Sequence, residues 1–501
     1  MHKIYGDIYE VYMCNERCIW ICRGDLCEAI YNSPNKFLFR TTPNNGLDEL
    51  NATLEGLSFN RNWELWKFNR KLVTKSLTSQ KFLRDALEYI QVVWEEMEGY
   101  LKEYETLEDD DNGKILDFSK WISTWSTDMT LFLITNQNAF SLANYNSTIS
   151  QNSLLLQNAP KSILKSPGAF IENTIAYLES WIFFAFTPKF VRMLPGFKER
   201  VKSFYDKGNS LRRDIKEIIQ KRRKEIEIMD NNIVKEKDIE RMKNQDSDDE
   251  YDDSQTGFCS DLLTTILTMN ANRSINKDTE YNEDNVHSKY MTDDNITGLL
   301  IEVVGGGVET TPSTICYIIY YLAHYSSVRE CLLKELDHTF GCNPNYKFEM
   351  EDLNKLKYCE AIINEVMRIF PTSPSNFRMA NEPCEIGDYV FPKNTQFLLN
   401  YQIINSHPAH WINPNEFNPE RFLNSSNESR KSNQYFQAFG GGHKVCPGKI
   451  FAMLQLKSFL VLLYRKWEVE LVDMNAPIKS YDITTRSCQQ LEVRIRRRKF
   501  I

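Results

Sequence analysis

The sequence predicts a mainly α-helical protein with a small β-rich region. Residues 299–323 and 351–370 are apolar at helical spacing, and another apolar run, 450–460, follows a glycine-rich loop. Short segments around 377–378 and 389–399 have the length and composition of strands. The chain has 501 residues, a length that allows one large domain or up to about three average ones.

The composition is that of a globular protein. Hydrophobic residues make up 42% and charged residues 26% of the chain, which excludes disorder of the whole. The net charge of −8 argues against a nucleic-acid-binding protein, which usually carries a basic excess. The twelve cysteines lack the paired spacing of zinc sites, so we expect mostly buried thiols in a reducing compartment.

The negative charge is concentrated in residues 244–295. This stretch contains thirteen Asp or Glu and three Lys or Arg, a net of −10, so the remaining residues sum to +2. A run of this kind repels itself and has little apolar surface to bury. We expect an acidic, flexible insertion; a regulatory or partner-binding loop is the alternative.

The N-terminus begins with alternating polar and apolar residues, which indicates a strand. We find no basic segment followed by an apolar stretch, as a signal peptide has, and no apolar stretch long enough for an anchor. The sequence is therefore expected to lack an N-terminal membrane anchor.

Residues 299–323 are long and apolar enough to cross a bilayer, but they include Glu302, Glu309 and Pro312. Two uncompensated carboxylates are expensive in lipid, so a buried central helix that begins near Thr292 fits better. Its three consecutive glycines, residues 305–307, lower helix propensity, which suggests that a ligand lies beside the backbone.

The helix predicted over 351–370 ends at Pro371 and places Glu365 and Arg368 on one face. Taken alone, this pattern is typical of a surface ion pair. An irregular segment rich in Asn and Pro, residues 417–422, follows the predicted strands.

A glycine-rich loop leads from Phe439 to a single cysteine, Cys446, and an apolar helix follows. Glycines allow a backbone to approach a flat cofactor, and a helix N-terminus favours a thiolate. A structural thiol and a metal ligand both remain open on this pattern alone.

Together these motifs resemble those of the cytochrome P-450 superfamily, the haem-thiolate monooxygenases, from about Tyr5 to the C-terminus. Four motifs occur in the family's order, and a fifth, Trp66-Lys-Phe-Asn-Arg70, matches a haem-contacting helix. The four are Gly306-Gly-Val-Glu-Thr310, Glu365-x-x-Arg368, Phe417-x-Pro-Glu-Arg-Phe422 and the loop F-x-x-G-x-x-x-C-x-G, with Phe439, Gly442, Cys446 and Gly448 at its fixed positions. The resemblance implies one domain over residues 1–501, an α-helical bundle around haem with a small β-rich subdomain.

The resemblance implies a role for each matching residue. Cys446 is expected to be the axial thiolate ligand of the iron in haem b, where a thiolate favours O–O cleavage. Glu365, Arg368 and Arg421 are expected to form a buried ion-pair set that supports the cysteine loop. The remaining cofactor-binding residues are expected to be Trp66, Arg70 and Arg378 at the propionates, Gly306 and Gly307 beside the oxygen site, and Phe439, Gly442, Lys444 and Gly448 in the loop.

In the family, an acid and an alcohol on the long helix deliver protons to oxygen; here they are Glu309 and Thr310. The alternative is that the Thr310 hydroxyl only forms a hydrogen bond to the backbone of its own helix.

The resemblance further implies a small apolar substrate and electrons that come from NADPH through a separate reductase. A cytochrome b-type donor is a second possible source of electrons. A haem-thiolate isomerase or dehydratase that does not use O2, and a non-catalytic haem protein, are the rival readings.

Three features depart from the family's pattern. Lys444 replaces the usual Arg or His and lacks the planar guanidinium fork, and Gly306 replaces the usual Ala.

The third departure, the expected lack of an anchor, leaves three possible locations: the cytosolic face of the endoplasmic reticulum membrane, a peripheral association with a membrane, and the cytoplasm. Residues 181–194 are either a membrane-contacting patch or part of the core. Basic residues near the cysteine, Lys444 and Lys449 with Lys67 and Lys71, are candidates for reductase contact.

Overall fold

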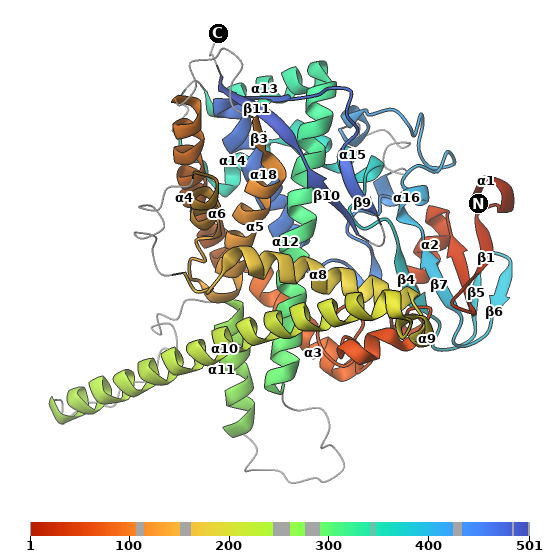
Figure 1. Cartoon of the computed structure of the whole chain (residues 1–501), viewed down its shortest axis with the longest axis horizontal. Helices are drawn as coiled ribbons and strands as arrows, with labels where there is room; N and C mark the ends of the chain where they lie inside the picture. Colours follow the sequence, from red (N-terminus) through yellow and green to blue (C-terminus); the bar gives the residue numbers. More distant parts are fainter. Residues whose placement is uncertain are drawn as a thin grey trace.

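The computed structural model of the chain confirms the mainly α-helical class (Figure 1). It describes residues 2–106, 115–150, 162–243, 261–275, 291–341, 343, 346–423, 433–482 and 485–498. The α-helices are α1 (His2–Tyr5), α2 (Gly24–Tyr31), α3 (Trp63–Thr78), α4 (Gln80–Thr106), α5 (Phe118–Thr135), α6 (Ser141–Ser150), α8 (Pro167–Phe186), α9 (Lys189–Arg192), α10 (Pro195–Lys243), α11 (Leu262–Ile275), α12 (Asp293–His324), α13 (Ser326–Phe340), α14 (Met350–Lys355), α15 (Lys357–Ile369), α16 (Tyr401–Ile404) and α18 (Lys449–Lys466). Short 3-10 helices are η1 (Pro34–Lys36), η2 (Asn45–Leu50), η5 (Pro419–Phe422) and η6 (Gly442–Lys444).

Helix α12 runs through the middle of the molecule (Figure 1, green). It begins where the sequence predicts, because Thr292 and Asn295 cap its first turn reciprocally, and it continues through Pro312. Helices α5, α8, α10, α15 and α18 pack around it. Its apolar residues face these neighbours, so the segment that resembles a membrane span is a core helix.

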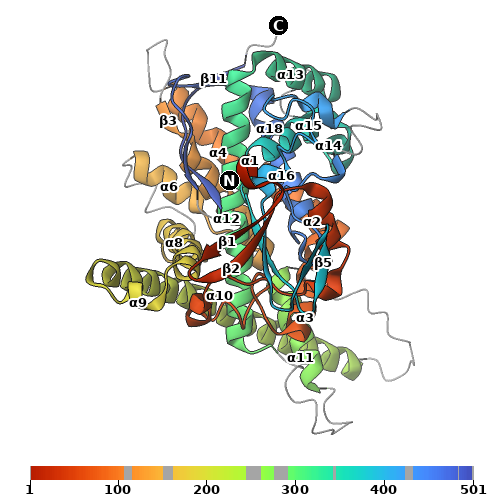
Figure 2. The same cartoon turned by 90° about the vertical axis from the view of Figure 1, so that its right-hand side faces the viewer.

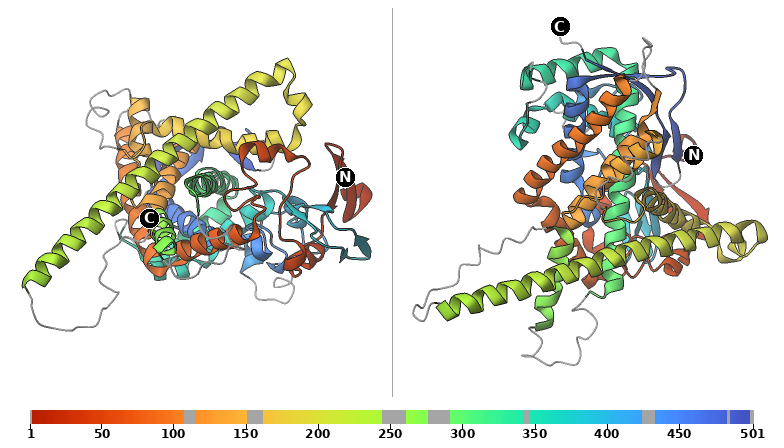
Figure 3. Two further views of the ribbon diagram at one scale, coloured as in Figure 1. Left: turned by 90° about the horizontal axis from the view of Figure 1, so that it is seen from below. Right: turned by 60° about the vertical axis from the view of Figure 1, so that its left-hand side comes forward.

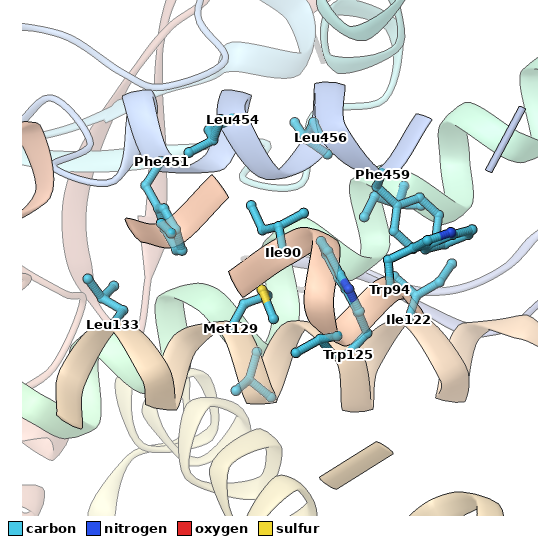
Figure 4. Close-up of a cluster of buried hydrophobic side chains, with 14 of the residues drawn as sticks. Ile90, Trp94, Ile122, Trp125, Met129, Leu133, Phe451, Leu454, Leu456 and Phe459 are labelled. Carbon is cyan, nitrogen blue, oxygen red and sulfur yellow. The ribbon is translucent and has the colours of Figure 1, made fainter. Parts of the chain in front are cut away.

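The main core lies between α4, α5 and α18 (Figure 4). Aromatic rings carry much of the packing: Trp94 and Trp125 both contact Phe459 edge-on, with ring centroids 5.3 and 5.0 Å apart. Phe451, at the start of α18, contacts Phe82. This packing fixes the N-terminal end of α18, which directly follows the cysteine loop.

The β-rich region lies beside the helices, and Figure 2 views it face-on. Its four-stranded sheet has the order β1-β2-β7-β4, in which β2 and β7 run parallel and the other pairs are antiparallel. A second sheet has the order β3-β11-β8, and β5 pairs with β6 and β9 with β10. The strands are β1 (Ile8–Met13), β2 (Glu16–Ile21), β3 (Ile115–Asp117), β4 (Asn376–Met379), β5 (Cys384–Ile386), β6 (Tyr389–Phe391), β7 (Gln396–Leu399), β8 (Trp467–Leu471), β9 (Lys479–Asp482), β10 (Arg486–Gln490) and β11 (Glu492–Arg497).

Residues 244–295 are not one continuous flexible insertion, as the sequence predicted, because they include a helix. Helix α11 lies within it, and Leu262, Leu263 and Ile266 are buried in the core. The apolar sequence of this helix explains the difference, because these residues bury surface that a solvated loop does not have. The strongly acidic residues 246–253 fall outside the described residues, so flexibility there stays a prediction.

Helix α10 follows a tight turn after α9 and extends past the rest of the body toward its C-terminal end (Figure 3). It packs against α8 and α12. Within the described residues, none of the helices has both the length and the apolar character needed to cross a membrane.

Candidate active site

A cavity of about 350 Å³ lies between the middle of α12 and the loop that precedes α18. Gly306, Gly307 and Thr310 of α12 line the cavity, and so does Cys446 of the loop. The structure therefore brings together motifs that are separated by about 140 positions in the sequence. Apolar side chains of α3, α5 and α18 also line it: Val73, Leu77, Leu133, Phe451 and Leu456.

The loop before α18 is shaped by its glycines. Gly442 has a φ of +62°, and a Cβ at Gly441 would lie 2.5 Å from the ring of Tyr31. The amide N–H of Cys446 donates to the carbonyl of Phe439 over 2.9 Å and closes the loop. Other residues at these glycines would strain or displace the backbone that carries Cys446.

The Cys446 side chain is exposed to the cavity, and desolvation by the surrounding protein raises the pKa of its thiol above the ordinary value. The N–H of Gly448 and the charges of Arg70, Arg40 and Lys449 partly oppose that effect. A bound metal cation would complete the stabilisation of the thiolate, because a coordinating thiol is deprotonated. The site thus suits a metal-thiolate bond better than a free thiolate.

A cluster of buried cations occupies one end of the cavity. Arg40, Arg70 and Lys444 line it, and Arg378 lies behind the loop. They donate to backbone carbonyls: Arg40 and Arg378 to Lys444 and Gly441, and Arg70 to Val445 over 2.6 Å. None of these four residues forms an ion pair with another described residue.

This cation cluster, defined as Arg40, Arg70, Arg378 and Lys444, is electrostatically unfavourable by itself. Burial and mutual repulsion lower the pKa of Lys444 to about 6 and the pKa of Arg40 to about 10, although the carboxyl group of Glu302 in the same cavity wall opposes both shifts. Unpaired buried cations are costly, and carboxylates are their natural partners. Two propionates of a haem would supply the missing anions, and the apolar walls and the thiol of Cys446 suit the rest of that cofactor.

Trp66 lies next to this cluster, and its indole N–H, which was expected to contact a propionate, forms a hydrogen bond within the protein. The N–H donates to the carbonyl of Leu57 over 3.0 Å, and the ammonium group of Lys444 lies 4.1 Å from the centre of its ring. Lys444 also donates to Leu57. Trp66 thus positions Lys444 and the 57–58 turn, and its predicted propionate contact stays a prediction.

The two glycines of the α12 motif do different things. A Cβ at Gly306 would meet nothing within 4 Å, so this position leaves open space at the cavity. A Cβ at Gly307 would lie 2.1 Å from Oγ1 of Thr130, and the carbonyl of Gly307 accepts a hydrogen bond from Ser126. Gly307 therefore permits close packing of α12 against α5, in addition to lining the cavity.

Thr310 and Glu309 point to different environments. The Thr310 hydroxyl donates to the carbonyl of Gly306 over 2.6 Å and lines the cavity. Glu309 is buried against the segment that leads into β10, where its Oε1 accepts from Thr485 over 3.2 Å. Glu309 does not line the cavity, whereas Thr310 and Thr485 do.

Glu365, Arg368 and Arg421 come together below the cysteine loop. Arg368 donates to both carboxylate oxygens of Glu365 over 2.7 and 2.9 Å, and Arg421 donates to Oε1 over 3.0 Å. Arg368 also donates to the carbonyl of Asn405, whose side chain accepts from the N–H of Gln437. This last contact links the ion-pair set to the segment that enters the cysteine loop.

Three of these residues were not identified from the sequence: Arg40, Asn405 and Thr485. Each lies outside the motifs identified in the sequence, and it reaches the site only through the tertiary fold. Arg40 belongs to none of the motifs and to no helical or strand-like pattern in the sequence.

The comparisons with known proteins agree with this geometry. A sequence model of the family "Cytochrome P450" matches residues 1–491. A steroid 17-alpha-hydroxylase/17,20 lyase of Squalus acanthias is 29% identical over 222 residues, which are 44% of this chain and 43% of that protein. A tabersonine 3-oxygenase of Catharanthus roseus is 32% identical over 193 residues, 38% of either protein. The chain therefore matches less than half the length of these curated relatives.

Solved structures show the same fold. The haem domain of cytochrome P450DA superposes with a TM-score of 0.70 at 17% identity, covering 99% of this chain and 91% of that one. Another cytochrome P450 structure gives a TM-score of 0.73 at 18% identity, covering 99% and 96%. At such identities the likeness concerns the fold alone. The match of the family model over nearly the whole chain shows that this protein belongs to the cytochrome P450 family.

Proposed function

We propose that this protein is a haem-thiolate monooxygenase that uses O2 and inserts one oxygen atom into an apolar organic substrate. The observation that carries the proposal is the cavity itself, whose lining combines the thiol of Cys446, cations of the cluster and Thr310. Bound haem b would supply the iron at which O2 is reduced and oxygen is transferred.

The residues that line the cavity would have different roles in binding haem and in the reaction. Cys446 would ligate the iron, and the cation cluster would hold the propionates by charge-assisted hydrogen bonds. The apolar side chains of α3, α5 and α18 would exclude water. Thr310 would orient a proton donor at the distal wall, as its place beside open space at Gly306 allows.

The substrate is proposed only as a class. The two relatives named above carry names that refer to a steroid and to tabersonine. The predominantly apolar walls of this cavity support an apolar organic molecule here, lipid-like or xenobiotic.

Electrons are proposed to come from NADPH through a separate reductase, or from a cytochrome b-type donor. Lys67, Lys71 and Lys449 are exposed, although Lys67 is already paired with Glu64 over 2.6 Å. Lys444 is buried and points to Leu57, so the expectation that it meets a reductase is wrong. The remaining exposed lysines support a basic docking surface.

Membrane contact is proposed for a smaller patch than the sequence suggested. Phe183 and Phe184 of the candidate segment are buried in the core, as the alternative reading held. Phe190, Met193 and Leu194, around α9, are 71%, 64% and 50% exposed. This exposed patch supports a peripheral contact with the cytosolic face of the endoplasmic reticulum membrane.

The rival functions make different predictions for the acid and alcohol. An isomerase or dehydratase that does not use O2, and a haem carrier, have no use for a proton-delivering pair, whereas Glu309 and Thr310 are both present. Their retention favours the monooxygenase.

The proposal is tested by isotope labelling. The haem-loaded protein, a microsomal-type reductase and NADPH are incubated under ¹⁸O2 with substrates selected by spectral shift from a lipid panel. We expect one ¹⁸O atom in the product, and T310A should divert electrons to hydrogen peroxide. Product formation without label, or without a need for O2, would support the isomerase or dehydratase instead.

A further inference from the structure

The buried carboxyl group of Glu309 is separated from the cavity. Glu309 is 7% exposed and lies between α12 and β10, and it does not line the cavity. The neighbouring Thr310 does, but its hydroxyl already donates to the carbonyl of Gly306. Consecutive residues of a helix point about 100° apart, so the two side chains do not form a direct path from acid to cavity.

A second threonine bridges this gap. The hydroxyl of Thr485 donates to Oε1 of Glu309 over 3.2 Å, and Thr485 is also part of the cavity wall. Thr485 therefore contacts the carboxyl group of Glu309 and also lines the cavity. A hydroxyl can accept one proton while it gives up another, which a methyl group cannot.

The position of Thr485 is fixed by its neighbours. The N–H of Arg486 donates to the carbonyl of Thr372 over 2.7 Å, and its guanidinium donates to Gln402 over 2.8 Å. Two residues further on, the N–H of Cys488 donates to the hydroxyl of Ser313 in α12 over 3.1 Å. These bonds hold the start of β10 against α12 and against the segments of Thr372 and Gln402, and they keep the hydroxyl in place.

The same strand leads from Glu309 toward solvent. Ser487 lies two residues after Thr485, on the same side of an extended chain, and its hydroxyl is close enough to the carboxyl group to lower its pKa. The side-chain amide of Gln489, an exposed residue, donates to that hydroxyl over 3.2 Å. Thr485, Glu309 and Ser487 therefore form a polar row between the cavity and the surface at Gln489.

The carboxyl group is suited to exchange protons near neutral pH. Burial, with a smaller repulsion from Glu179 of α8, raises the pKa of Glu309 to about 7, and Thr485 and Ser487 oppose the shift. Its second oxygen, Oε2, is buried and has no hydrogen bond to a described residue. Protonation at Oε2 therefore breaks no bond.

We propose that Thr485 is a proton-relay residue that carries protons from Glu309 to the cavity, an inference that rests on the proposed monooxygenase function. In the step, the carboxyl group of Glu309 rotates so that its protonated oxygen takes the place of Oε1 and faces Thr485. It then gives its proton to Oγ1 of Thr485, while the hydroxyl proton of Thr485 passes to an acceptor in the cavity. Glu309 becomes a carboxylate and takes up the proton of the Ser487 hydroxyl, which in turn regains a proton from solvent water. No electrons move in this step.

The test compares T485V, which keeps the shape of the side chain but has no hydroxyl, with T485S, which keeps the hydroxyl. Haem-loaded protein and reductase are supplied with NADPH between pH 6 and 8.5, and NADPH oxidation is measured in H2O and D2O. Release of either water or hydrogen peroxide consumes protons, so no substrate needs to be known. Reduction of the haem under carbon monoxide serves as the control for haem content and electron transfer.

We expect the wild-type rate to fall as pH rises through about 7, because Glu309 must be protonated to donate. T485V should lower the rate by about 10²-fold, at the low end for a positioned general acid, and should remove this pH dependence. T485S should restore both. A T485V protein with normal haem reduction and the wild-type rate and pH profile would overturn the relay while leaving the monooxygenase proposal intact.

An infrared titration gives a readout independent of turnover. The carbonyl band of protonated Glu309 is assigned by its loss in E309Q, and its pH midpoint is measured in the haem-loaded wild-type and T485V proteins. Loss of the hydrogen bond to the carboxylate should raise that midpoint in T485V, whereas T485S should keep it. An identical midpoint in T485V would contradict the contact on which the relay depends.

Discussion

Glu365 and Arg368 form a bidentate ion pair in which neither side chain has any exposed surface. The remaining donors of Arg368 reach the carbonyls of Asn405, Pro414 and Glu416, so a single guanidinium joins α15 to two other chain segments. One of these segments continues to the cysteine loop through the Asn405–Gln437 contact. The pair therefore determines where Cys446 lies, although it does not touch the cavity.

Glu365→Gln should destabilise the protein strongly, because it leaves the buried guanidinium of Arg368 without a counter-charge. We expect a loss of about 3–5 kcal/mol in the free energy of unfolding, measured with urea. The control is Glu470→Gln, which breaks an exposed pair with Arg496 and should cost less than about 1 kcal/mol. Equal effects of the two substitutions would contradict the buried role.

Arg40→Gln should weaken haem retention, because the structure places Arg40 among the cations that face the proposed propionates. Loss of one charge-assisted hydrogen bond corresponds to about 1.5–3 kcal/mol, so haem should dissociate at least about tenfold faster. The rate is measured by transfer to an excess of a haem-scavenging apoprotein. Lys75→Gln, an exposed change on α3, is the control, and a rate for R40Q no faster than for this control would argue against the cation cluster as the propionate site.

Gly306→Ala and Gly307→Ala should differ sharply despite being adjacent. The added methyl group at position 307 would lie 2.1 Å from Oγ1 of Thr130, and overpacking of this kind costs about 1–3 kcal/mol. At position 306 the methyl group meets no neighbour, so stability should be unchanged or slightly higher. Thermal unfolding of the two variants checks this contrast, and equal stabilities would contradict the described packing of α12 on α5.

Asp128 should make stability depend on pH. Burial raises its pKa from 3.8 to about 7 in the folded protein, although the N–H groups of Ser141 and Leu142 oppose the shift. Between these two values the folded protein binds more protons than the unfolded chain, so this contribution to stability decreases as pH rises from about 4 to 7. In urea unfolding over this range, Asp128→Asn should remove that part of the slope. An unchanged slope would show that Asp128 is ionised in the folded protein.

Much of the site could be predicted because its residues lie in short motifs with fixed spacing. The i, i+3 spacing of Glu365 and Arg368 and the glycine loop around Cys446 are local features, and a local pattern can be read directly from the chain. The mainly α-helical class followed in the same way from the periodicity of the segments that became α12, α15 and α18.

The rest depends on contacts between distant segments. Arg40 and Thr485 enter the cavity wall only through contacts between distant segments, and neither has a local signal. Arg40 follows the bridge between Phe39 and Met379, and β10 packs against α12. Lys444 looked like a surface charge because lysine usually is one, yet the turn at Leu57 buries it. Helix α11 was hidden because the acidic residues on both sides dominated the composition of its neighbourhood.

The central claim is that Cys446 provides a thiolate ligand to a haem iron. It is tested most directly by the absorption spectrum of the reduced, haem-loaded protein under carbon monoxide. We predict the strongly red-shifted Soret band of a carbon monoxide complex with a thiolate opposite, and its loss in Cys446→Ser. A wild-type spectrum without that band, or a C446S variant that retains it, would contradict the account.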